Sequence, residues 1–318
     1  MDTPPRNFAL TGAAGYIAPR HLQAIHDTGQ RLVAALDPSD SVGILDRFFP
    51  QARFFVDFER FDRHAEKLRR MAPEQRIDVV SICSPNYLHD AHIRFALRIR
   101  ADALCEKPLV LNPWNLDALE ELEAEYERRV YTVLQLRLHP AIMDLRERVA
   151  AEPADLVHDI DLTYITSRGP WYFVSWKGDE SRSGGIGTNI GIHFFDMLAW
   201  VFGPLRDQRV HVAKPDKMAG LLELKRARVR WFLSLDRADL PAEAGGKTTF
   251  RSLTLDGKAI EFSEGFADLH TACYRELLAG RGFGIRDTRP SIEMVHRIRT
   301  SHAVGLTGDF HPRARTAR

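Results

Sequence analysis

The sequence has little lysine, little cysteine and no excess of charge of either sign. Its 318 residues include 8 Lys, 36 Arg and 3 Cys, and Lys+Arg 44 against Asp+Glu 43 leaves a formal net charge of +1. This balance argues against a nucleic-acid-binding protein, which carries a strong basic excess. Three scattered cysteines are too few for a disulfide framework or a cysteine-rich metal site. They are typical of the reducing cytoplasm, which is the expected compartment.

Long apolar runs are absent as well. No stretch of about 18 apolar residues exists, so no membrane span is expected, and residues 1–6 lead directly into a strand-like segment rather than a secretory signal. The composition, 44% hydrophobic and 27% charged, is that of a soluble globular protein. At roughly 150 residues per domain the length predicts two domains, placed at residues 1–137 and 138–318.

The first half alternates short apolar runs with segments of helical period, the pattern of βαβ units and a parallel sheet. We therefore expect an α/β, Rossmann-type N-terminal domain. The predicted strands are residues 8–10, 32–36, 79–83, 103–105 and 130–136, and the predicted helices are residues 16–28, 89–99, 116–129 and 140–151.

The second half predicts an α+β domain. Strands are expected at 156–165, 228–236 and 252–262, and helices at 190–202, 266–278 and 291–304. Apolar and polar residues alternate along 228–236, which suits an antiparallel sheet with one open face. Phe232 breaks the alternation, because its aromatic ring falls on the polar face. The tail, residues 309–318, is expected to be a frayed terminus.

A small-residue turn follows the first predicted strand. Gly12, Gly15 and Ala18 allow a tight turn and let a pyrophosphate approach the backbone at a helix N-terminus. The spelling departs from G-x-G-x-x-G, and a plain βα turn explains it too. Asp37, 22 residues after Gly15, stands where an acid binds the ribose hydroxyls of NAD and repels the 2′-phosphate of NADP. The alternative role of Asp37 is to start the turn before Pro38.

Two further motifs follow buried strands. Ser84-Pro85-Asn86-Tyr87-Leu88-His89 comes after the central strand, where ligands bind in parallel sheets, although it also suits a helix-capping turn. Glu106-Lys107-Pro108 follows the next strand. A lysine that is partly desolvated there has a lowered pKa and suits acid–base chemistry. The alternative is a surface Glu–Lys pair.

The segment 184–196 places Asn189 and His193 four residues apart, on one face of a helix, and Asp196 three residues later. A histidine in that setting is either a core residue or part of a site. His89 and His92, three apart, have no nearby carboxylate or cysteine that completes a ligand set, so no metal is expected.

These motifs resemble, in the same order, those of the Gfo/Idh/MocA oxidoreductases, which are NAD(P)-dependent sugar and cyclitol dehydrogenases. The resemblance covers nearly the whole chain, and Glu-Lys-Pro is its most specific mark. It implies a Rossmann domain followed by a large, mostly antiparallel open-faced sheet, NAD as cofactor and a homotetramer. It assigns the substrate hydroxyl to Lys107 and His193. The family usually has Asp where this chain has Asn189.

Within the family, residues 8–21, 163–169 and 263–270 are similar to the UDP-N-acetylglucosaminuronate 3-dehydrogenases of the WlbA/WbpB type. That similarity implies oxidation of the C3 hydroxyl of UDP-N-acetyl-D-glucosaminuronate to a ketone, in the synthesis of lipopolysaccharide O-antigen sugars. Some relatives recycle NADH with 2-oxoglutarate, which is therefore a second expected partner. The alternatives are a family dehydrogenase acting on an unactivated sugar or inositol, and a catalytically inactive NAD-binding regulatory protein.

The expected site residues combine these motifs with cations for an anionic substrate. The catalytic pair is Lys107 and His193. The cofactor is assigned to Gly12, Ala14, Gly15, Tyr16, Ile17, Asp37, Ser84, Asn86, His89, Glu106, Lys107 and Gln135. The substrate is assigned to Lys107, Arg137, Arg168, Lys177, Asn189 and His193. Trp171, Tyr172 and Trp176 near these cations suit either stacking on uracil or a subunit interface.

Overall fold

The computed structural model describes residues 4–261 and 268–316. The chain divides into two compact units: the first comprises Met1–Gln135 and Ala267–Arg289, and the second comprises Leu136–Phe266 and Pro290–Arg318. The first unit is therefore discontinuous in sequence. Within the described residues, every helix is too short or too polar to cross a bilayer.

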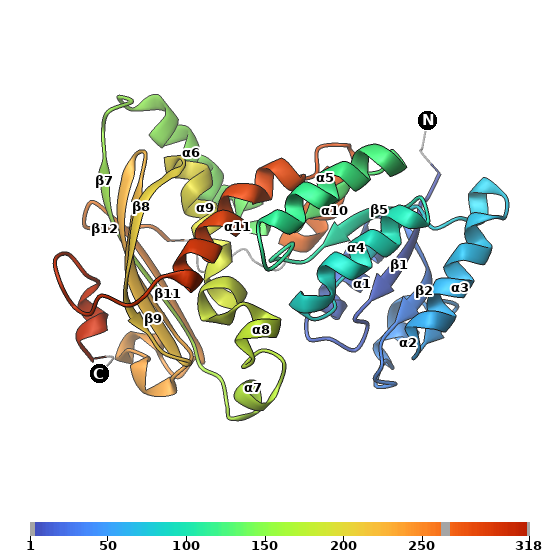
Figure 1. Ribbon diagram of the computed structural model, residues 1–318, viewed down its shortest axis with the longest axis horizontal. Helices are drawn as coiled ribbons and strands as arrows, with labels where there is room; N and C mark the ends of the chain where they lie inside the picture. The colour runs from blue at the N-terminus through green and yellow to red at the C-terminus, as the bar shows by residue number, and fades with distance from the viewer. Residues whose placement is uncertain (1–3, 262–267, 317–318) are drawn as a thin grey trace. The chain divides into compact units, whose positions relative to one another are not determined.

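The first unit contains a six-stranded parallel sheet (Figure 1). The strand order is β3-β2-β1-β4-β5-β6. Successive strands are added on one side of β1 up to β3 and on its other side from β4 onward. The carboxyl ends of β1 and β4 therefore form the position where nucleotides bind in sheets of this kind. The predicted Rossmann architecture is confirmed. The strands are β1 (Asn7–Thr11), β2 (Arg31–Leu36), β3 (Arg53–Phe55), β4 (Val79–Ile82), β5 (Asp102–Cys105) and β6 (Val130–Thr132).

The strand predicted at 130–136 is too long by four residues. β6 ends at Thr132, and a 3₁₀ turn, Gln135–Leu138, begins soon after it. Val133, Leu134 and Leu136 are buried before and within this turn rather than in the sheet, and continuous burial without alternation does not distinguish the two.

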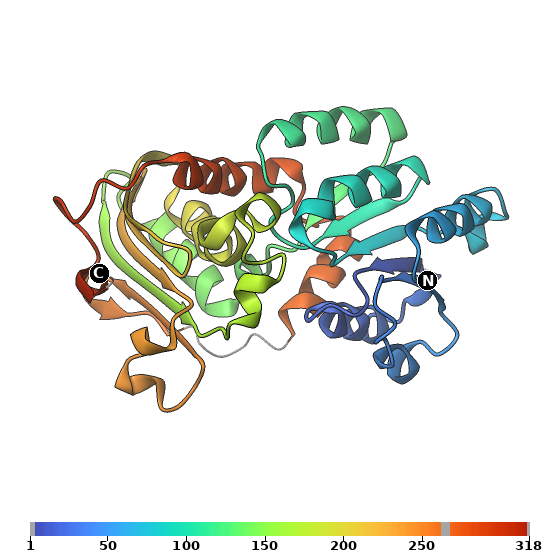
Figure 2. The ribbon, with the colours of Figure 1, turned by 60° about the horizontal axis from the view of Figure 1, so that its bottom comes forward.

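Helices cover both faces of this sheet. α4 and α5 lie on one face and α1 on the other (Figure 2), and α10 packs beside α1. Since α10 lies some 240 residues after α1 in the sequence, its packing closes the first unit with a distant segment. The helices are α1 (Ala18–Asp27), α2 (Ile44–Phe48), α3 (Phe58–Arg69), α4 (His89–Arg98), α5 (Trp114–Tyr126) and α10 (Leu269–Leu278).

The second unit contains a six-stranded mixed sheet in the order β12-β11-β7-β10-β9-β8. The pair β7–β10 is parallel and every other pair is antiparallel, which confirms the mostly antiparallel sheet. Two of its strands, β8 and β9, lie where no element is predicted. The strands are β7 (His158–Thr166), β8 (Leu205–Ala213), β9 (Lys217–Leu224), β10 (Ala227–Ser234), β11 (Thr249–Leu255) and β12 (Lys258–Ala259).

Helices α6 (Pro140–Ala151) and α9 (Ile192–Phe202) cover one face of this sheet (Figure 1). Trp231 on β10 meets Phe195 on α9 edge to face, with ring centroids 5.2 Å apart, and both are fully buried. α11 (Ile285–Thr300) begins in the first unit and continues into the second, six residues before its predicted start. The predicted start at Phe266 of helix α10 and the end at Phe262 of the strand 252–262 lie outside the described residues.

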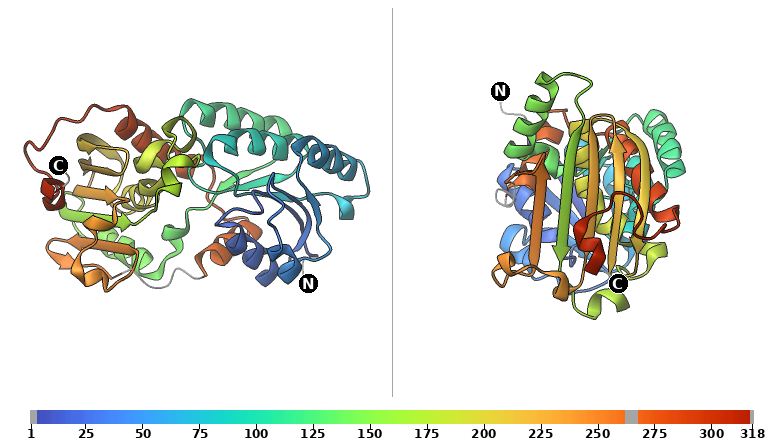
Figure 3. Two further views of the ribbon diagram at one scale, coloured as in Figure 1. Left: turned by 90° about the horizontal axis from the view of Figure 1, so that it is seen from below. Right: turned by 90° about the vertical axis from the view of Figure 1, so that its left-hand side faces the viewer.

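The C-terminal segment crosses the other face of the second sheet (Figure 3, right). The expectation of a frayed tail is therefore wrong for residues 309–316. Phe232, which breaks the alternation of β10, is fully buried under this segment: its ring stacks on His311 with centroids 5.8 Å apart, and Ala314 packs against it. Phe232 therefore lies on the polar face of β10 because the C-terminal segment covers it, a contact that the periodicity of β10 alone does not predict.

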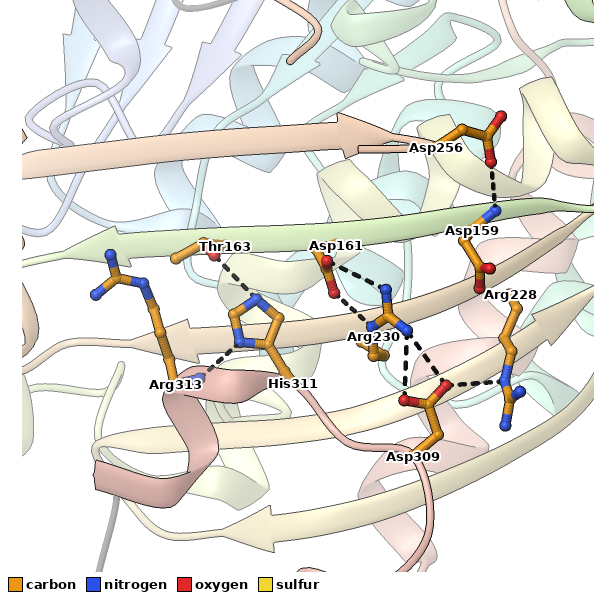
Figure 4. Close-up of polar contacts among 9 residues, drawn as sticks. All are labelled: Asp159, Asp161, Thr163, Arg228, Arg230, Asp256, Asp309, His311 and Arg313. Carbon is orange, nitrogen blue, oxygen red and sulfur yellow. Dashed lines mark hydrogen bonds and ion pairs between the residues drawn. The ribbon is translucent and has the colours of Figure 1, made fainter. Parts of the chain in front are cut away.

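Ion pairs hold the same segment down (Figure 4). Asp309 accepts from Arg228 at 3.1 Å and from Arg230 at 3.3 Å, and Arg230 donates to Asp161 at 2.6 Å. His311 Nε2 lies 3.1 Å from the Thr163 hydroxyl. The tail thus fills one part of the sheet face with both apolar and charged contacts.

Candidate active site

The turn between β1 and α1 requires glycine at position 12. Gly12 has φ +83°, and a Cβ there would lie 2.5 Å from the Cys83 carbonyl oxygen, in the loop that follows β4. Its amide donates to the Leu36 carbonyl at 2.8 Å. The first glycine therefore lets three strand ends approach one another at the carboxyl edge of the sheet, which is the close approach that a pyrophosphate site uses.

Asp37 is tied to this turn. Its Oδ2 accepts from the Ala14 amide at 2.9 Å and its Oδ1 accepts from the Ser39 amide at 2.9 Å. The Asp37 carboxylate therefore takes part in the turn, as the alternative role predicts, and its cofactor role stays a prediction. Of the residues predicted beside it, Tyr16 is 92% exposed, whereas Gly15 and Ile17 are half-buried.

His89 joins the two loops that follow β4 and β5. Its Nδ1 lies 2.7 Å from the Pro108 carbonyl oxygen and its Nε2 lies 2.9 Å from the Ser84 carbonyl oxygen. Burial lowers the pKa of His89. With both ring nitrogens against backbone oxygens, His89 positions the Ser84 and Lys107 loops, while Asn86 is buried in the turn between Ser84 and His89.

Glu106 lies in a buried cluster. Its Oε1 accepts from His21 Nε2 at 3.0 Å and from His270 Nε2 at 3.0 Å, and its Oε2 lies 3.2 Å from the Lys107 backbone nitrogen. These three side chains come from the end of β5, from α1 and from α10. Their ligand-type atoms lie within 4.8 Å of one another, a spacing that a metal ion also accepts, and each short contact is a hydrogen-bond length. The expectation of no metal stays a prediction.

Lys107, the predicted base, follows Glu106 directly. It is half-buried, and the Lys107–Pro108 peptide is cis. Its backbone is fixed on both sides, by Glu106 Oε2 and by the contact of His89 with Pro108. A lysine on a constrained loop at the carboxyl edge of a nucleotide-binding sheet is well placed to hold or take up a proton.

The residues at this edge fit a dinucleotide. Within the described residues, no group hydrogen-bonds the buried Oε1 of Gln135 or the buried hydroxyl of Thr11 at the end of β1. Buried polar atoms without a partner are costly, and Thr11 and Gln135 lie at the end of β1 and in the turn after β6. The missing side chain of Gly12 makes room for the backbone of the loop after β4, and the assignment of these residues to the cofactor stays a prediction.

In the second unit, Arg137 and Asp196 form a buried ion pair. The guanidinium Nε and Nη2 donate to the two carboxylate oxygens at 2.8 and 2.7 Å, with side chains 6% and 4% exposed. The guanidinium also lies over the Trp200 ring, 5.9 Å from its centroid. This bidentate pair joins the turn after β6 to helix α9. Arg137, which the sequence assigns to the substrate, thus uses two of its three guanidinium nitrogens to bind Asp196.

Asn189 lies in a short π-helical turn, Gly187–Gly191, that leads into α9. Its Nδ2 donates to the Tyr172 hydroxyl at 2.8 Å, and Tyr172 is buried at 2% exposure. His193 follows in the first turn of α9 and is half-buried. The irregular turn is the kind often found at functional sites, and Tyr172 is a partner of Asn189 that the sequence spacing does not predict.

Lys177 and Arg168 belong to the aromatic loop before α8 (Glu180–Ser183), in which α7 spans Trp171–Val174. The Lys177 ammonium lies 4.4 Å from the Trp176 ring centroid and 5.8 Å from that of Trp171. Burial lowers the pKa of Lys177, and the positive charge of Arg168 adds to that effect. Two neighbouring cations with lowered hydration suit an anionic ligand.

The structure therefore brings the predicted residues together in two groups. The first unit contains the nucleotide-type residues with Lys107, and the second contains Arg137, Arg168, Lys177, Asn189 and His193. Sequence reasoning missed His21, His270 and Tyr274 as members of a buried cluster, and it assigned Tyr172 to stacking or to an interface rather than to a hydrogen bond with Asn189. Their hydrogen-bond partners lie 17 to 253 positions away along the chain, so spacing carries no signal for them.

The parallel sheet, the glycine turn and the acid after β2 define a dinucleotide-dependent oxidoreductase. Two family models agree: "Oxidoreductase family, NAD-binding Rossmann fold" matches residues 6–134, and "Oxidoreductase family, C-terminal alpha/beta domain" matches residues 156–238. The chain belongs to the Gfo/Idh/MocA oxidoreductase family. The predicted family and the predicted NAD cofactor are confirmed.

Solved structures give a closer comparison. The WlbA (WbpB) dehydrogenase from Thermus thermophilus, solved in complex with NAD and UDP-GlcNAcA, is 52% identical to this chain, with a TM-score of 0.92 over 96% of this chain and 99% of that one. The same enzyme has been solved with NAD and alpha-ketoglutarate. The WlbA dehydrogenase from Bordetella pertussis is 17% identical over 96% of this chain and 100% of that one, with a TM-score of 0.76, and shows a shared fold.

Curated relatives match more distantly. The inositol 2-dehydrogenase of Rhizobium meliloti is 26% identical over 62% of this chain and 54% of its own length. The D-glucoside 3-dehydrogenase of Escherichia coli is 28% identical over 40% of this chain and 36% of its own length. The chain thus aligns with about a third to half the length of these relatives.

Proposed function

We propose that this protein is an NAD-dependent dehydrogenase that oxidises the C3 hydroxyl of UDP-N-acetyl-D-glucosaminuronate to a ketone. The carrying observation is the 52% identity, over 96% of the chain, to the Thermus dehydrogenase solved with NAD and UDP-GlcNAcA. The reaction balances as secondary alcohol plus NAD⁺ giving ketone plus NADH plus a proton. NAD supplies the hydride acceptor, and the protein handles the proton and the anionic substrate.

The cofactor is proposed to lie along the carboxyl edge of the first sheet. Gly12, Ala14 and Gly15 are proposed to let the pyrophosphate approach the backbone at the start of α1, while Tyr16 and Ile17 border it. The Asp37 carboxylate binds the adenosine ribose hydroxyls and disfavours a 2′-phosphate. At the other end, the cofactor lies among groups of the loops after β4, β5 and β6, which are Ser84, Asn86, His89, Glu106, Lys107 and Gln135.

Lys107 and His193 are proposed to manage the hydroxyl proton. A general base must lie within about 3 Å of the oxygen that it deprotonates. Lys107 is neutral when it accepts the proton, and His193 accepts it in turn or passes it onward. The Asn189 amide, whose Nδ2 donates to the Tyr172 hydroxyl, is proposed to fix the orientation of the substrate without adding charge.

The substrate's carboxylate and diphosphate need fixed cations. Arg168 and Lys177 are proposed for this role because they are adjacent, half-buried and within unit two of the chain. The Trp171 ring, 53% exposed, is available for stacking. Arg137 remains a predicted substrate residue whose ion pair with Asp196 makes a structural role the alternative.

The biological setting is part of the proposal. The ketone is a substrate for an aminotransferase in lipopolysaccharide O-antigen sugar synthesis. 2-Oxoglutarate reoxidises the cofactor in place, supported by the relative solved with alpha-ketoglutarate. The proposed oligomer is a homotetramer, which the family resemblance supports. The proposed compartment is the cytoplasm, which the three buried cysteines present as free thiols support.

The test incubates the protein with NAD⁺ and UDP-N-acetylglucosaminuronate, with and without 2-oxoglutarate. We expect a product lighter by two hydrogen atoms in mass spectrometry, with multiple turnovers when 2-oxoglutarate is present. UDP-N-acetylglucosamine, which lacks the carboxylate, should react poorly. Lys107→Met should abolish turnover and preserve NAD binding, whereas Lys67→Met, a matched change on α3, should leave both turnover and NAD binding unchanged.

A second candidate function is oxidation of an unactivated sugar or inositol, favoured by the match to inositol 2-dehydrogenase. The same assay includes myo-inositol and glucose. Oxidation of either one without reaction of the nucleotide sugar would favour that function. Cofactor binding without oxidation of any of these substrates would favour an inactive regulatory protein.

A further inference from the structure

A carboxylate lies buried beneath the catalytic loop, and the mechanism above gives its charge no role. Glu106 is 7% exposed, and its Oε1 is shared by the Nε2 atoms of His21 and His270, each at 3.0 Å. The two imidazole rings meet edge to face, with centroids 5.2 Å apart. Burying a carboxylate costs several kcal/mol unless it is hydrogen-bonded, so the two histidines are what makes this charge tolerable.

The hydrogen bonds around His21 have one consistent direction when Glu106 is ionised. Both histidines donate Nε2–H to the carboxylate. His21 Nδ1 then accepts from the Tyr274 hydroxyl at 2.9 Å, and the Tyr274 oxygen accepts from the Ser81 hydroxyl at 2.6 Å. Each hydroxyl proton in this chain has one acceptor and Glu106 Oε1 accepts from both histidines, so the network is complete with an anionic Glu106 and a neutral His21.

Glu106 lies among buried side chains that carry no charge, and Lys107 is the basic residue next to it in the chain. Burial raises the pKa of Glu106, but the hydrogen bonds from both histidines outweigh it and hold that pKa well below its ordinary value. Burial lowers the pKa of His21. Burial also raises the pKa of the Cys83, Cys105 and Tyr274 side chains nearby, so these stay neutral. The buried Glu106 carboxylate is therefore the anionic group of the cluster.

Its place in the fold relates this charge to the cofactor. Glu106 follows β5, whereas Asp37 follows β2 and the glycine turn follows β1. In a sheet of this order, the end of β2 and the turn before α1 take the adenosine and the pyrophosphate, so the second half of a dinucleotide extends over the ends of β4 and β5. That half carries the nicotinamide ring, which is a cation when oxidised and neutral when reduced.

We propose that the His21–Glu106–His270 cluster sets the redox preference of the bound cofactor, favouring NAD⁺ over NADH through the buried charge of Glu106. The inference rests on the proposed NAD-dependent function and deepens it. His21 and His270 act through Glu106 and are positioning residues. A fixed anion attracts the oxidised ring and has no such attraction for the reduced one, so it changes the ratio of the two affinities.

The test measures the dissociation constants of NAD⁺ and NADH by titration calorimetry at pH 8.5, which is above the ordinary pKa of a histidine side chain. Glu106→Gln keeps the shape and both hydrogen bonds to Oε1 but removes the charge. We expect the dissociation constant of NADH divided by that of NAD⁺ to fall by about tenfold in this variant. A change of this size corresponds to the attraction between one buried negative charge and the positive nicotinamide ring across the interior of a protein. Glu106→Asp keeps the charge and should restore most of the ratio.

Two controls separate charge from structure. Glu66→Gln makes the same substitution at an ionised carboxylate on α3, paired with Arg69 at 2.7 Å, and should leave the ratio unchanged. Tyr274→Phe breaks the hydrogen-bond chain but keeps Glu106 ionised, and should also leave it unchanged. If Glu106→Gln fails to fold, His270→Arg tests the same idea, because a cation beside Glu106 cancels the charge and should lower the ratio.

The outcomes are distinguishable. Equal weakening of both nucleotides in Glu106→Gln, with the ratio within about twofold of wild type, would show a purely structural cluster and overturn the inference. An equal fall in Glu66→Gln would show a general charge effect and overturn it too. Wild-type protein that binds neither nucleotide would instead refute the proposed function.

Discussion

The ion pair between Arg137 and Asp196 gives the sharpest prediction about the second unit. Asp196→Asn removes the carboxylate charge from a guanidinium that is 6% exposed and makes bidentate contacts at 2.8 and 2.7 Å. A buried charge left without its partner costs about 3–5 kcal/mol. Replacing both partners by apolar residues of similar size, as in Arg137→Met with Asp196→Leu, should recover most of that loss, because no unpaired charge remains.

The assay is calorimetric unfolding of the second unit's transition, together with KM for the nucleotide sugar. We expect Asp196→Asn to lower the melting temperature by several degrees, at roughly 2–4 °C per kcal/mol for a unit of this size, and the double variant to unfold near the wild-type temperature. If Arg137 serves only this ion pair, which is the alternative to its predicted substrate role, the double variant should keep KM within about twofold.

Two results would refute this reasoning. If Asp196→Asn is as stable as wild type, the Arg137 guanidinium does not lose stability when its carboxylate partner is removed, and the expected cost of an unpaired buried charge is wrong. If the double variant is stable but its KM rises by an order of magnitude or more, Arg137 binds the substrate and the sequence-based assignment holds. Arg146→Met is a matched control, since Arg146 also stacks on Trp200, at 4.1 Å, and should have a small effect.

Three further predictions concern other parts of the chain. Gly12→Ala should abolish NAD binding measured by calorimetry, because the new Cβ would lie 2.5 Å from a backbone carbonyl and φ is +83°; unaltered affinity would contradict the tight approach. Deleting the chain after Gly308 should lower stability by about 2 kcal/mol or more in thermal unfolding, because it exposes Phe232; an unchanged melting temperature would mean that the segment does not cover the sheet. Burial lowers the pKa of His92 to about 4, so as the pH falls this side chain is protonated in the unfolded chain before it is protonated in the folded one. Up to about 3 kcal/mol of the free energy of unfolding is therefore lost as the pH falls from 6.5 to 4. His92→Gln should reduce the loss of stability between pH 7.5 and 4.5, and a variant with the same pH profile as wild type would contradict this prediction.

Local patterns predicted the features that depend on local residues. The parallel sheet followed from continuous apolar strands such as Val79–Ile82, and the nucleotide turn followed from Gly12, whose positive φ and close contact with Cys83 leave little alternative. Asp37 was placed correctly at the end of β2 because the spacing from a glycine turn to that strand end is set by one helix.

Other features depend on contacts between distant segments and left no local signal. β8 has an irregular register with β9, and its burial alternates poorly, so its residues do not show a strand period. Nothing near residues 267–289 indicates that they return to the first unit. The partners of Glu106 lie 85 and 164 positions away, and the residue that covers Phe232 lies 79 positions away.

The most direct test of the central claim follows the hydride itself. UDP-N-acetylglucosaminuronate labelled with deuterium at C3 is incubated with the protein, NAD⁺ and 2-oxoglutarate, and the products are examined by mass spectrometry. We predict an unlabelled 3-keto sugar and 2-hydroxyglutarate that carries the deuterium, with a slower rate than for the unlabelled substrate if hydride transfer limits turnover. A keto product that retains the deuterium would place the oxidation at another carbon and contradict the account.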